Sequence, residues 1–299
     1  PSYWGERPLD RISIIVPAHN EQNVLGRCLS SMLDQAAPGE LEIIVAANGC
    51  SDATVGVARS FGDDVQVLEL AEASKHRALA AGDSAATQFP RLYVDADVAL
   101  GTASLRVVAD ALRSGSARVA APQLRVRLEG ASWAVRAYYR IWLQLPYHAN
   151  GTIGSGVYGL SESGRNRFES FPDLISDDGF VRLNFAPHER LNVPQSYFEI
   201  AAPRAMGSLL AVKTRSQKGW RQLRERFPEL LANDAKDRSE YPRALCMVLF
   251  TPKNWLAALV YAFVAVVTKV RAWELNRSGR LSDWERDDTS RDTGSESSR

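Results

Sequence analysis

Short apolar runs rich in isoleucine and valine alternate with amphipathic stretches over residues 1–115. Apolar runs of about four to eight residues are typical of strands that are buried on both faces of a sheet. The expected strands are Ile12–Val16, Leu41–Ala46, Val65–Leu70 and Arg91–Val94. The pattern therefore predicts a buried, mainly parallel sheet.

Apolar positions at helical spacing lie between these runs, where residues three and four apart share one helix face. The clearest stripe consists of Val24, Leu25, Cys28, Leu29, Met32 and Leu33. Further helices are expected over residues 51–61, 74–88, 102–113 and 131–146. The alternation predicts an α/β fold with a mainly parallel central sheet and helices on both faces. Such sheets bind ligands in the loops at the carboxyl ends of their strands.

The alternation weakens after residue 115. We expect residues 1–115 to form the first half of one domain, and residues 116–243 to form a second half that is continuous with it. Residues 244–275 are strongly apolar and are expected to be helical. Residues 276–299 are charged and poor in aromatic residues, a composition that predicts a disordered tail.

The overall charge excludes one class of partner. The 299 residues carry 36 Lys and Arg against 35 Asp and Glu, a formal net charge of +1. No basic field therefore indicates nucleic acid as a partner. The three cysteines are far apart, and Cys28 and Cys246 have apolar neighbours, so we expect reduced core residues. Residues 1–8 lack the apolar core of a secretory signal, which favours a cytoplasmic protein.

Two predicted loops have the composition of ligand sites. Pro17–Glu21 follows the first strand, and Asn20 is placed to cap the next helix, whose N-terminus would favour an anion. The alternative is a capped loop that binds nothing. After the second strand, Asn48 has an amide able to pair with the edge of a base, although Asn48-Gly49 is also ordinary turn sequence.

Charged residues mark the loops after the third and fourth strands. Lys75 lies in the first turn of a predicted helix, where a cation opposes the helix dipole. Phosphate binding or simple surface exposure would explain it. Asp95 and Asp97 follow an apolar strand, and alternate positions of an extended chain point the same way. Two close carboxylates favour Mg²⁺ or Mn²⁺ between them, whereas a solvated pair that caps a helix is the alternative.

Taken together, these motifs resemble family 2 of the glycosyltransferases, which have the GT-A fold. Similar in order and spacing are Ile14–Glu21, Glu42–Asp52, the Lys75–Gly82 segment, Asp95-Ala96-Asp97 and Ser176-Asp177-Asp178. The resemblance covers residues 11–183. The sequence departs from the family pattern at Ala47 and Asn48, where acidic residues are usual, at Ala80 and at Asp177.

The resemblance implies a GT-A-like fold and an inverting transfer of sugar from a nucleotide diphosphate, a UDP- or GDP-sugar, to an acceptor hydroxyl. It implies that Asp178 is the general base, with Asp177 at the edge of the site. It also implies that Asp97 and Asp95 bind Mn²⁺ or Mg²⁺, with Asp95 beside the ribose. The residues implied for the nucleotide and its phosphates are Pro17, Ala18, Glu21, Asn48 and Lys75.

Two later segments add candidate ligands. His188 is a candidate metal ligand, because related enzymes sometimes use a late histidine, although a loop histidine without a ligand is the alternative. Thr214–Trp220, which contains Lys218, resembles the family's basic segment that closes over the donor diphosphate. A solvated helix turn would have the same composition.

The apolar run Trp255–Val267 is shorter than the roughly 20 residues that a spanning helix needs. Flanking aromatic residues and the cations Lys269 and Arg271 suit a membrane interface and a lipid-linked acceptor. A buried helix is the alternative.

Other functions remain open at this point. A nucleotidyltransferase would want a glycine-rich basic loop after the first strand, where Pro17–Glu21 stands instead. A nicotinamide dehydrogenase is disfavoured because no Gly-x-Gly-x-x-Gly follows a strand. A nucleotide-sugar-binding scaffold without catalysis would keep the same fold.

Overall fold

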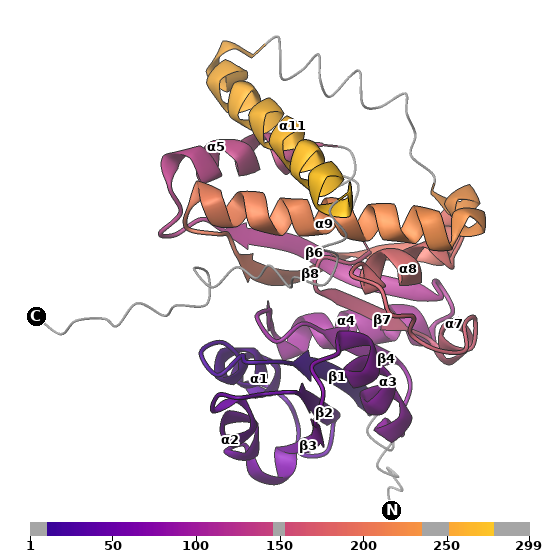
Figure 1. The fold of residues 1–299 in the computed structure, drawn as a ribbon. Helices are drawn as coiled ribbons and strands as arrows, with labels where there is room; N and C mark the ends of the chain where they lie inside the picture. Colours follow the sequence, from indigo (N-terminus) through magenta and orange to yellow (C-terminus); the bar gives the residue numbers. More distant parts are fainter. Residues whose placement is uncertain (1–10, 146–152, 235–250, 278–299) are drawn as a thin grey trace, which may run out of the picture.

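The computed structural model describes residues 11–145, 153–234 and 251–277. One sheet runs through the molecule, with the strand order β3-β2-β1-β4-β7-β6-β8-β5 (Figure 1). The strands are β1 Ile12–Ala18, β2 Leu41–Asn48, β3 Val65–Leu70, β4 Arg91–Val94, β5 Ala99–Leu100, β6 Val119–Arg127, β7 Val157–Leu160 and β8 Arg190–Ala201.

The sheet is parallel in its first half and mixed in its second. β1 pairs in parallel with β2 and β4, and β2 pairs in parallel with β3. β7 is antiparallel to both β4 and β6, whereas β8 is parallel to β6 and antiparallel to β5. Strands from both sides of residue 115 therefore share one sheet, and the ends of β1 and β4 lie near its middle.

Helices cover both faces of this sheet, as Figure 1 shows, which confirms the predicted α/β fold class. The α-helices are α1 Leu25–Leu33, α2 Thr54–Arg59, α3 Lys75–Ala85, α4 Thr102–Arg113, α5 Trp133–Trp142, α7 Glu162–Arg165, α8 Asp177–Leu183, α9 Met206–Arg226 and α11 Trp255–Arg277. Short 3₁₀ helices are η1 Gly62–Asp64, η2 Pro187–Glu189, η3 Pro228–Asn233 and η4 Pro252–Asn254.

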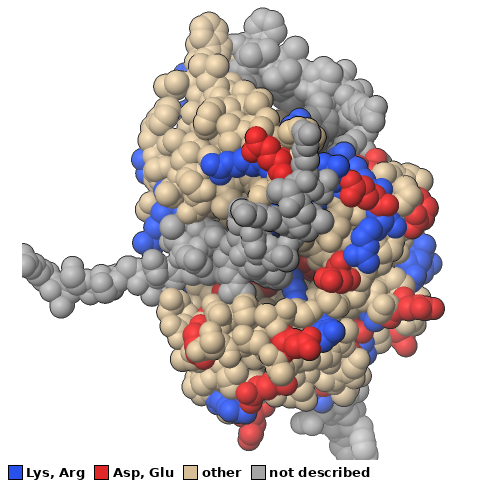
Figure 2. Space-filling view, viewed as in Figure 1, with Lys and Arg blue, Asp and Glu red and all other residues tan. Residues whose placement is uncertain are grey.

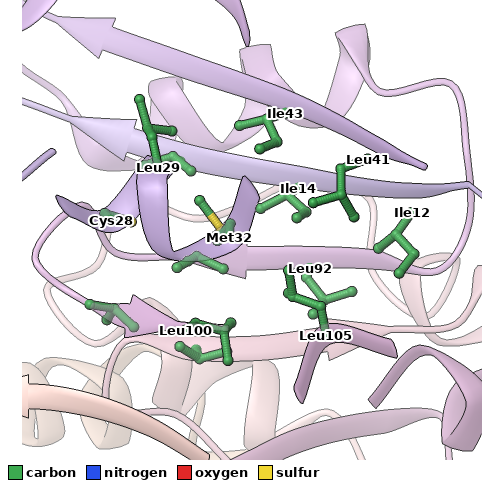
Figure 3. Packing of buried hydrophobic residues seen from close by; sticks show 14 of the residues in the cluster. Ile12, Ile14, Cys28, Leu29, Met32, Leu41, Ile43, Leu92, Leu100 and Leu105 are labelled. Atoms are coloured by element: carbon green, nitrogen blue, oxygen red, sulfur yellow. The ribbon is translucent and has the colours of Figure 1, made fainter. Parts of the chain in front are cut away.

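The period of two along β1 explains the two-sided core. Ile12 and Ile14 pack with α1 and α4 on one face, where Leu29 and Met32 of α1 also lie (Figure 3). Ile15 points to the other face and packs in the cluster that contains Leu79 of α3. Successive side chains of a strand point to opposite faces of the sheet. A strand that is buried on both faces therefore has apolar residues at consecutive positions.

The loop after β1 differs from its expected structure. Helix α1 begins at Leu25, and no side chain caps it. Asn20 lies in the left-handed region with φ 52°, and its Oδ1 accepts a hydrogen bond of 2.8 Å from the backbone N–H of Ser51. The prediction that Asn20 caps the helix is therefore wrong. Its side chain joins the loop after β1 to the loop after β2.

A buried ionic cluster fixes α3 against the sheet. Both oxygens of Asp83 are used: Oδ1 lies 2.8 Å from Arg91 of β4, and Oδ2 lies 2.8 Å from Arg165 of α7. The hydroxyl of Tyr93 donates to the same Oδ1 at 2.6 Å. A buried carboxylate is tolerable when cations and hydrogen-bond donors satisfy it. This anchor attaches the carboxyl end of α3 to β4 and α7, and Lys75 lies at the other end of the helix.

Helices α5, α9 and α11 form a further apolar layer with its own core, which includes Tyr138, Leu209 and Val264. Helix α11 continues well beyond Val267, where the apolar run ends. By length and composition alone, Pro252–Leu275, with a mean hydropathy of 1.6, is able to cross a membrane, and this corrects the length argument made from the sequence. Residues 244–250, with Cys246, and the predicted tail from residue 278 onward lie outside the described residues.

Candidate active site

A cavity of about 500 Å³ opens at the carboxyl ends of β1 and β4, the edge where parallel α/β sheets bind ligands. Its lining comes from distant parts of the chain, including the loop before β7, the start of α8 and the middle of α9. The predicted site residues that line it are Pro17, Lys75, Asp95, Asp177 and Asp178.

Lys75 lies between two carboxylates at one end of this cavity. Its Nζ is 2.8 Å from Oδ1 of Asp95 and 3.0 Å from Oδ1 of Asp177. Three elements therefore meet at one ammonium group: the first turn of α3, the segment after β4 and the first turn of α8. Ion pairing with these carboxylates explains why a cation is tolerated in a first helical turn.

Burial and charge compete over the pKa values of this group. Burial on its own would lower the pKa of Lys75, but the negative charges of Asp177 and Asp95 outweigh it, and the pKa is raised. Burial raises the pKa of Asp177 to about 6, with Lys75 opposing the rise and the charges of Asp178 and Asp95 adding to it. The cation therefore keeps a buried carboxylate and its neighbours together in one small volume.

Asp95 and Asp97 do not lie on an extended chain. β4 ends at Val94, and the next residues turn, with the backbone N–H of Val98 donating to the carbonyl of Asp95 at 3.1 Å. Asp95 lines the cavity, whereas Asp97 is absent from the lining and its carbonyl accepts from Arg27 at 3.3 Å. This segment is therefore a turn, and the alternation argument, which holds only for extended chain, does not apply to the two carboxylates.

A metal held by protein alone does not fit this part of the structure. Among the residues that the structure describes, no three His, Cys, Asp or Glu gather around one point. Magnesium is commonly bound by one or two carboxylates together with substrate phosphates. The side chain of Asp95 is 36% exposed and lines the cavity, so it fits a cation that is bound jointly by the protein and the phosphates of a substrate.

Asp178 is held in a fixed orientation by its neighbours. Its Oδ2 accepts from the backbone N–H of Ser155 at 3.0 Å, and its Oδ1 accepts from Ser176 Oγ at 3.0 Å and from the N–H of Gly179 at 2.7 Å. A Cβ added to Gly154, where φ is 122°, would lie 2.7 Å from Oδ2. The Gly-rich loop before β7 is thus a close support for this carboxylate.

Both acidic residues of the Ser176–Asp178 segment line the cavity. In an extended segment only one of two adjacent side chains would point into the cavity. The residues instead form the start of α8, with Asp177 and Asp178 in its first turn. In a helix, neighbouring side chains lie about 100° apart, so the two carboxylates reach different parts of one site.

Asn48 has a structural position in the loop after β2. It is buried, its Nδ2 donates to the carbonyls of Ala18 at 2.8 Å and Ala46 at 3.3 Å, and its Oδ1 accepts from the N–H of Ser74 at 2.9 Å. Both amide hydrogens are used, which leaves none for a nucleotide base. The side chain thus joins β1 and β2 to the start of α3, and a second lone pair of Oδ1 remains for a base.

Ala18 and Glu21 are buried in the loop after β1 and are absent from the cavity lining. The carbonyl of Ala18 accepts from Asn48, and the backbone N–H of Glu21 donates to Thr54 Oγ1 at 2.7 Å. These residues shape the loop on which Pro17 meets the cavity.

Helix α9 brings a different cation to the cavity from the one that the sequence indicated. Lys218 is buried and absent from the lining, whereas Arg215 lines the cavity, and its charge acts to lower the pKa of Lys75. The basic Thr214–Trp220 segment was recognisable from sequence. Only the rotation of α9 decides which of its cations faces inward, because three residues along a helix change the direction by about 300°.

His188 lies at the other edge of the sheet. It is exposed in η2, next to the start of β8, where Arg190 pairs with Val119 of β6. Val119 pairs with Leu160 of β7, and Leu160 pairs with Arg91, the first residue of β4. Asp95 follows β4 at its opposite end. His188 and Asp95 therefore lie at opposite ends of the strands, at least the length of β4 apart, which corrects the assignment of His188 as a ligand of the same metal.

A parallel half-sheet with carboxylates and a lysine at the carboxyl ends of its strands is the ligand-binding arrangement of an α/β protein. The family model for glycosyl transferase family 2 matches residues 13–163. The chain belongs to this family.

A curated relative agrees with the assignment to this family. The chain is 31% identical over 170 residues to a dolichyl-phosphate beta-glucosyltransferase of Drosophila melanogaster, a match that covers 48% of the chain and 49% of the relative. The chain thus spans about half the length of that relative.

Two solved structures have a similar fold. A mannosyltransferase from Pyrobaculum calidifontis, in complex with GDP-Man and Mn²⁺, superposes with a TM-score of 0.58 at 18% identity, over 90% of this chain and 79% of that one. Glucosyl-3-phosphoglycerate synthase from Mycobacterium tuberculosis, with Mn²⁺, UDP and its product, gives 0.52 at 16% identity, over 72% and 79%. At these identities the likeness establishes the fold.

The first prediction concerns the ion triad of Lys75, Asp95 and Asp177. Lys75→Met should lower the free energy of unfolding at pH 7 by about 3 kcal/mol, the scale for breaking a buried ion pair. Without the cation, the pKa of Asp177 rises further above its unfolded value. Native Asp177 then takes up a proton as the pH falls, so the deficit relative to the wild type should shrink from pH 7 to pH 5.

Urea denaturation at both pH values measures the deficit. The control is the double variant Lys75→Met/Asp177→Asn, which has no charge at either position and should regain part of the stability with little dependence on pH. An equal deficit for Lys75→Met at pH 7 and pH 5 would contradict the coupling.

Proposed function

We propose that this chain is an inverting glycosyltransferase that moves a sugar from a nucleotide diphosphate to an acceptor hydroxyl. The observation that carries the proposal is the meeting of Lys75, Asp95, Asp177 and Asp178 at one cavity, in a chain of glycosyl transferase family 2. A transferase of this kind needs positive charge near a departing diphosphate and a carboxylate near an attacking hydroxyl.

The donor lies at the carboxyl ends of β1 and β4 in this proposal, between Pro17 and Asp95. Arg215 supplies positive charge toward the diphosphate, and Asp95 and Asp97 hold a divalent cation. That cation, when bound, neutralises the charge of the leaving diphosphate. The GDP-Man and UDP in the similar structures, each with Mn²⁺, support a GDP- or UDP-sugar and manganese. Residues 1–115 are then the donor half, and residues 116–243 hold the acceptor and the base.

Asp178 is the general base in this proposal. Its two oxygens offer about four acceptor sites, of which three are occupied by Ser155, Ser176 and Gly179. The remaining site is available to the acceptor hydroxyl, which loses its proton to Asp178 as its oxygen attacks the anomeric carbon. The diphosphate leaves from the opposite side with the bonding electrons, and the anomeric configuration is inverted.

Asp177 has a different task in this mechanism. It is buried and paired with Lys75, so its charge is already balanced by a cation. A carboxylate in that position orients Lys75, and its ion pair with Lys75 leaves it less able than Asp178 to accept a proton from the acceptor. We therefore keep Asp177 as a supporting residue at the edge of the site.

Helix α11 supports a location at the cytoplasmic face of a membrane. Large apolar side chains are exposed along its whole length at spacings of three and four residues. They are Leu256, Leu259, Phe263, Val266, Val270 and Trp273. Figure 2 shows a broad uncharged surface over the upper part of the molecule, where Figure 1 places α11. An apolar stripe on a helix that packs against the domain with its other face suits insertion into the plane of a bilayer surface.

The second prediction concerns donor and metal. Saturation with GDP or UDP at about 100 times its dissociation constant should stabilise the protein by about 2.7 kcal/mol, and manganese should be required. Asp97→Asn should abolish the manganese dependence, whereas Asp110→Asn, on the exposed side of α4, should not. Thermal shift with and without Mn²⁺ gives the result, and unchanged nucleotide affinity in Asp97→Asn would remove that residue from the site.

The third prediction concerns the base. Asp178→Asn keeps the size of the side chain and removes its proton affinity, so the turnover rate should fall at least about a hundredfold with little change in donor binding. Asp177→Asn should lower the turnover rate less. Transfer from a labelled nucleotide sugar measures both. A wild-type chain that binds nucleotide sugar and never turns it over is a scaffold, and a larger effect of Asp177→Asn would exchange the two assignments.

The fourth prediction concerns the apolar stripe of α11. Leu259→Glu and Phe263→Glu together should release the protein from liposomes that contain anionic lipid, because charged groups are costly below the headgroups. Val107→Glu is the matched control, since Val107 is also an exposed apolar residue, 41% exposed on α4. Liposome flotation measures binding. A wild type that does not bind these liposomes would contradict the proposed membrane location.

A further inference from the structure

The cavity has a second wall that the proposed reaction does not use. Opposite the carboxylates, its lining comes from α5, α9 and α11 and is mostly aromatic and aliphatic. It includes Tyr138, Trp142, Leu145, Val212, Tyr261 and Val264. Ligand sites with such walls usually place a few polar groups among apolar ones to fix the orientation of the ligand. Ser216, Gln217 and Thr268 are polar residues of this wall, and Lys213 is a cation among its aromatic rings.

Lys213 lies in an aromatic cage. Its Nζ is 4.0 Å from the ring centroid of Trp142 and 5.5 Å from those of both Tyr138 and Tyr139, all on α5. Within residues 11–145, 153–234 and 251–277, no ion pair joins Lys213 to a carboxylate. Lys213 is half-buried, and the neighbouring rings recover part of the cost of removing its ammonium group from water, but they provide no counter-charge.

Among the residues that the structure describes, no acidic side chain acts on the pKa of Lys213. The titratable groups that face the cage are the phenols of Tyr138 and Tyr139 on α5 and of Tyr261 on α11, with Arg215 two residues along α9. Burial alone lowers the pKa of Lys213 to about 7. An anion bound in the cage would restore the charged form and raise that pKa again.

The apolar part of the same wall continues onto α11. Tyr261 and Val264 face the cavity, while Phe263 and Val266 of the same helix turns are exposed on the outside. One helix thus separates the cavity from the apolar stripe that we assign to a membrane surface. A ligand with an apolar chain would lie against this wall at low cost, since burying apolar area contributes about 25 cal/mol per Å².

We propose that this wall is the acceptor site, which takes an anionic amphiphile: Lys213 binds its phosphate-like group, and its apolar chain lies against α5 and α11. The identification of this ligand as the acceptor rests on the proposed function, because the attacking hydroxyl of the ligand must reach Asp178. A lysine that served only to attach α9 to α5 would need the aromatic contacts and no anion.

The fifth prediction tests this site with three probes that separate the chain from the charge. Octyl phosphate has both, octyl glucoside has the chain alone, and inorganic phosphate has the anion alone. By isothermal titration calorimetry, octyl phosphate should bind the full chain at least about tenfold more tightly than either of the others, a difference of about 1.4 kcal/mol.

Lys213→Met keeps the length of the side chain without its charge. It should weaken octyl phosphate at least about tenfold and leave octyl glucoside unchanged. Lys253→Met, an exposed lysine outside the cavity lining, is the matched control and should change neither. Titrations at pH 8 in two buffers of different ionisation enthalpy should show proton uptake on binding octyl phosphate in the wild type, and none in Lys213→Met.

Each other outcome overturns the inference in a recognisable way. Equal affinity for inorganic phosphate and octyl phosphate would mean that the site binds only an anion. Unchanged affinity of Lys213→Met for octyl phosphate would mean that Lys213 does not bind the ligand. If Lys213→Met loses affinity for both octyl phosphate and octyl glucoside, Lys213 maintains the structure of the site and does not recognise an anion. Nucleotide and Mn²⁺ binding is measured in parallel: a chain that binds octyl phosphate through Lys213 but no nucleotide would overturn the proposed function and leave this site standing.

Discussion

One ammonium group holds the candidate site together. Lys75 contacts Asp95 and Asp177, which lie more than eighty residues apart in the chain and on different elements. Without the cation, a buried carboxylate would face two others, Asp95 and Asp178, in a volume with little water. Like charges at that separation are strongly unfavourable. The position of α3 is in turn set by Asp83, which binds Arg91 of β4, so the core and the site depend on connected ion pairs.

The cavity joins two chemistries that a transferase of an amphipathic acceptor has to combine. One end is polar, with Asp178 held by Ser155 and Ser176, and the other is aromatic, with Lys213 beside Trp142. Helix α9 contributes to both ends and is covered by α11. A helical layer added to the GT-A sheet thereby gives the second half of the chain its own recognition surface, while the first half keeps the loops that resemble the family.

The local pattern of apolar residues was enough to predict the first half of the fold. The strands β1 to β4 and helix α1 follow from short apolar runs and one helical stripe, because burial against a sheet demands those periods whatever the neighbours are. The second half of the sheet was not predictable in this way. β8 pairs with β6 in parallel and with β5 in antiparallel, and such partners are chosen by packing between distant segments.

The sequence by itself determined which residue types gather at the strand ends, and so the family, the candidate carboxylates and Lys75. Tertiary structure decided what each of them touches. The amide of Asn48, a candidate base contact in the sequence, binds three backbone groups, and the rotation of α9 selects Arg215 over Lys218. Lys213 became visible only when α5 surrounded it with rings. Contact depends on direction in space, and a chain of residues specifies direction only after its segments have packed.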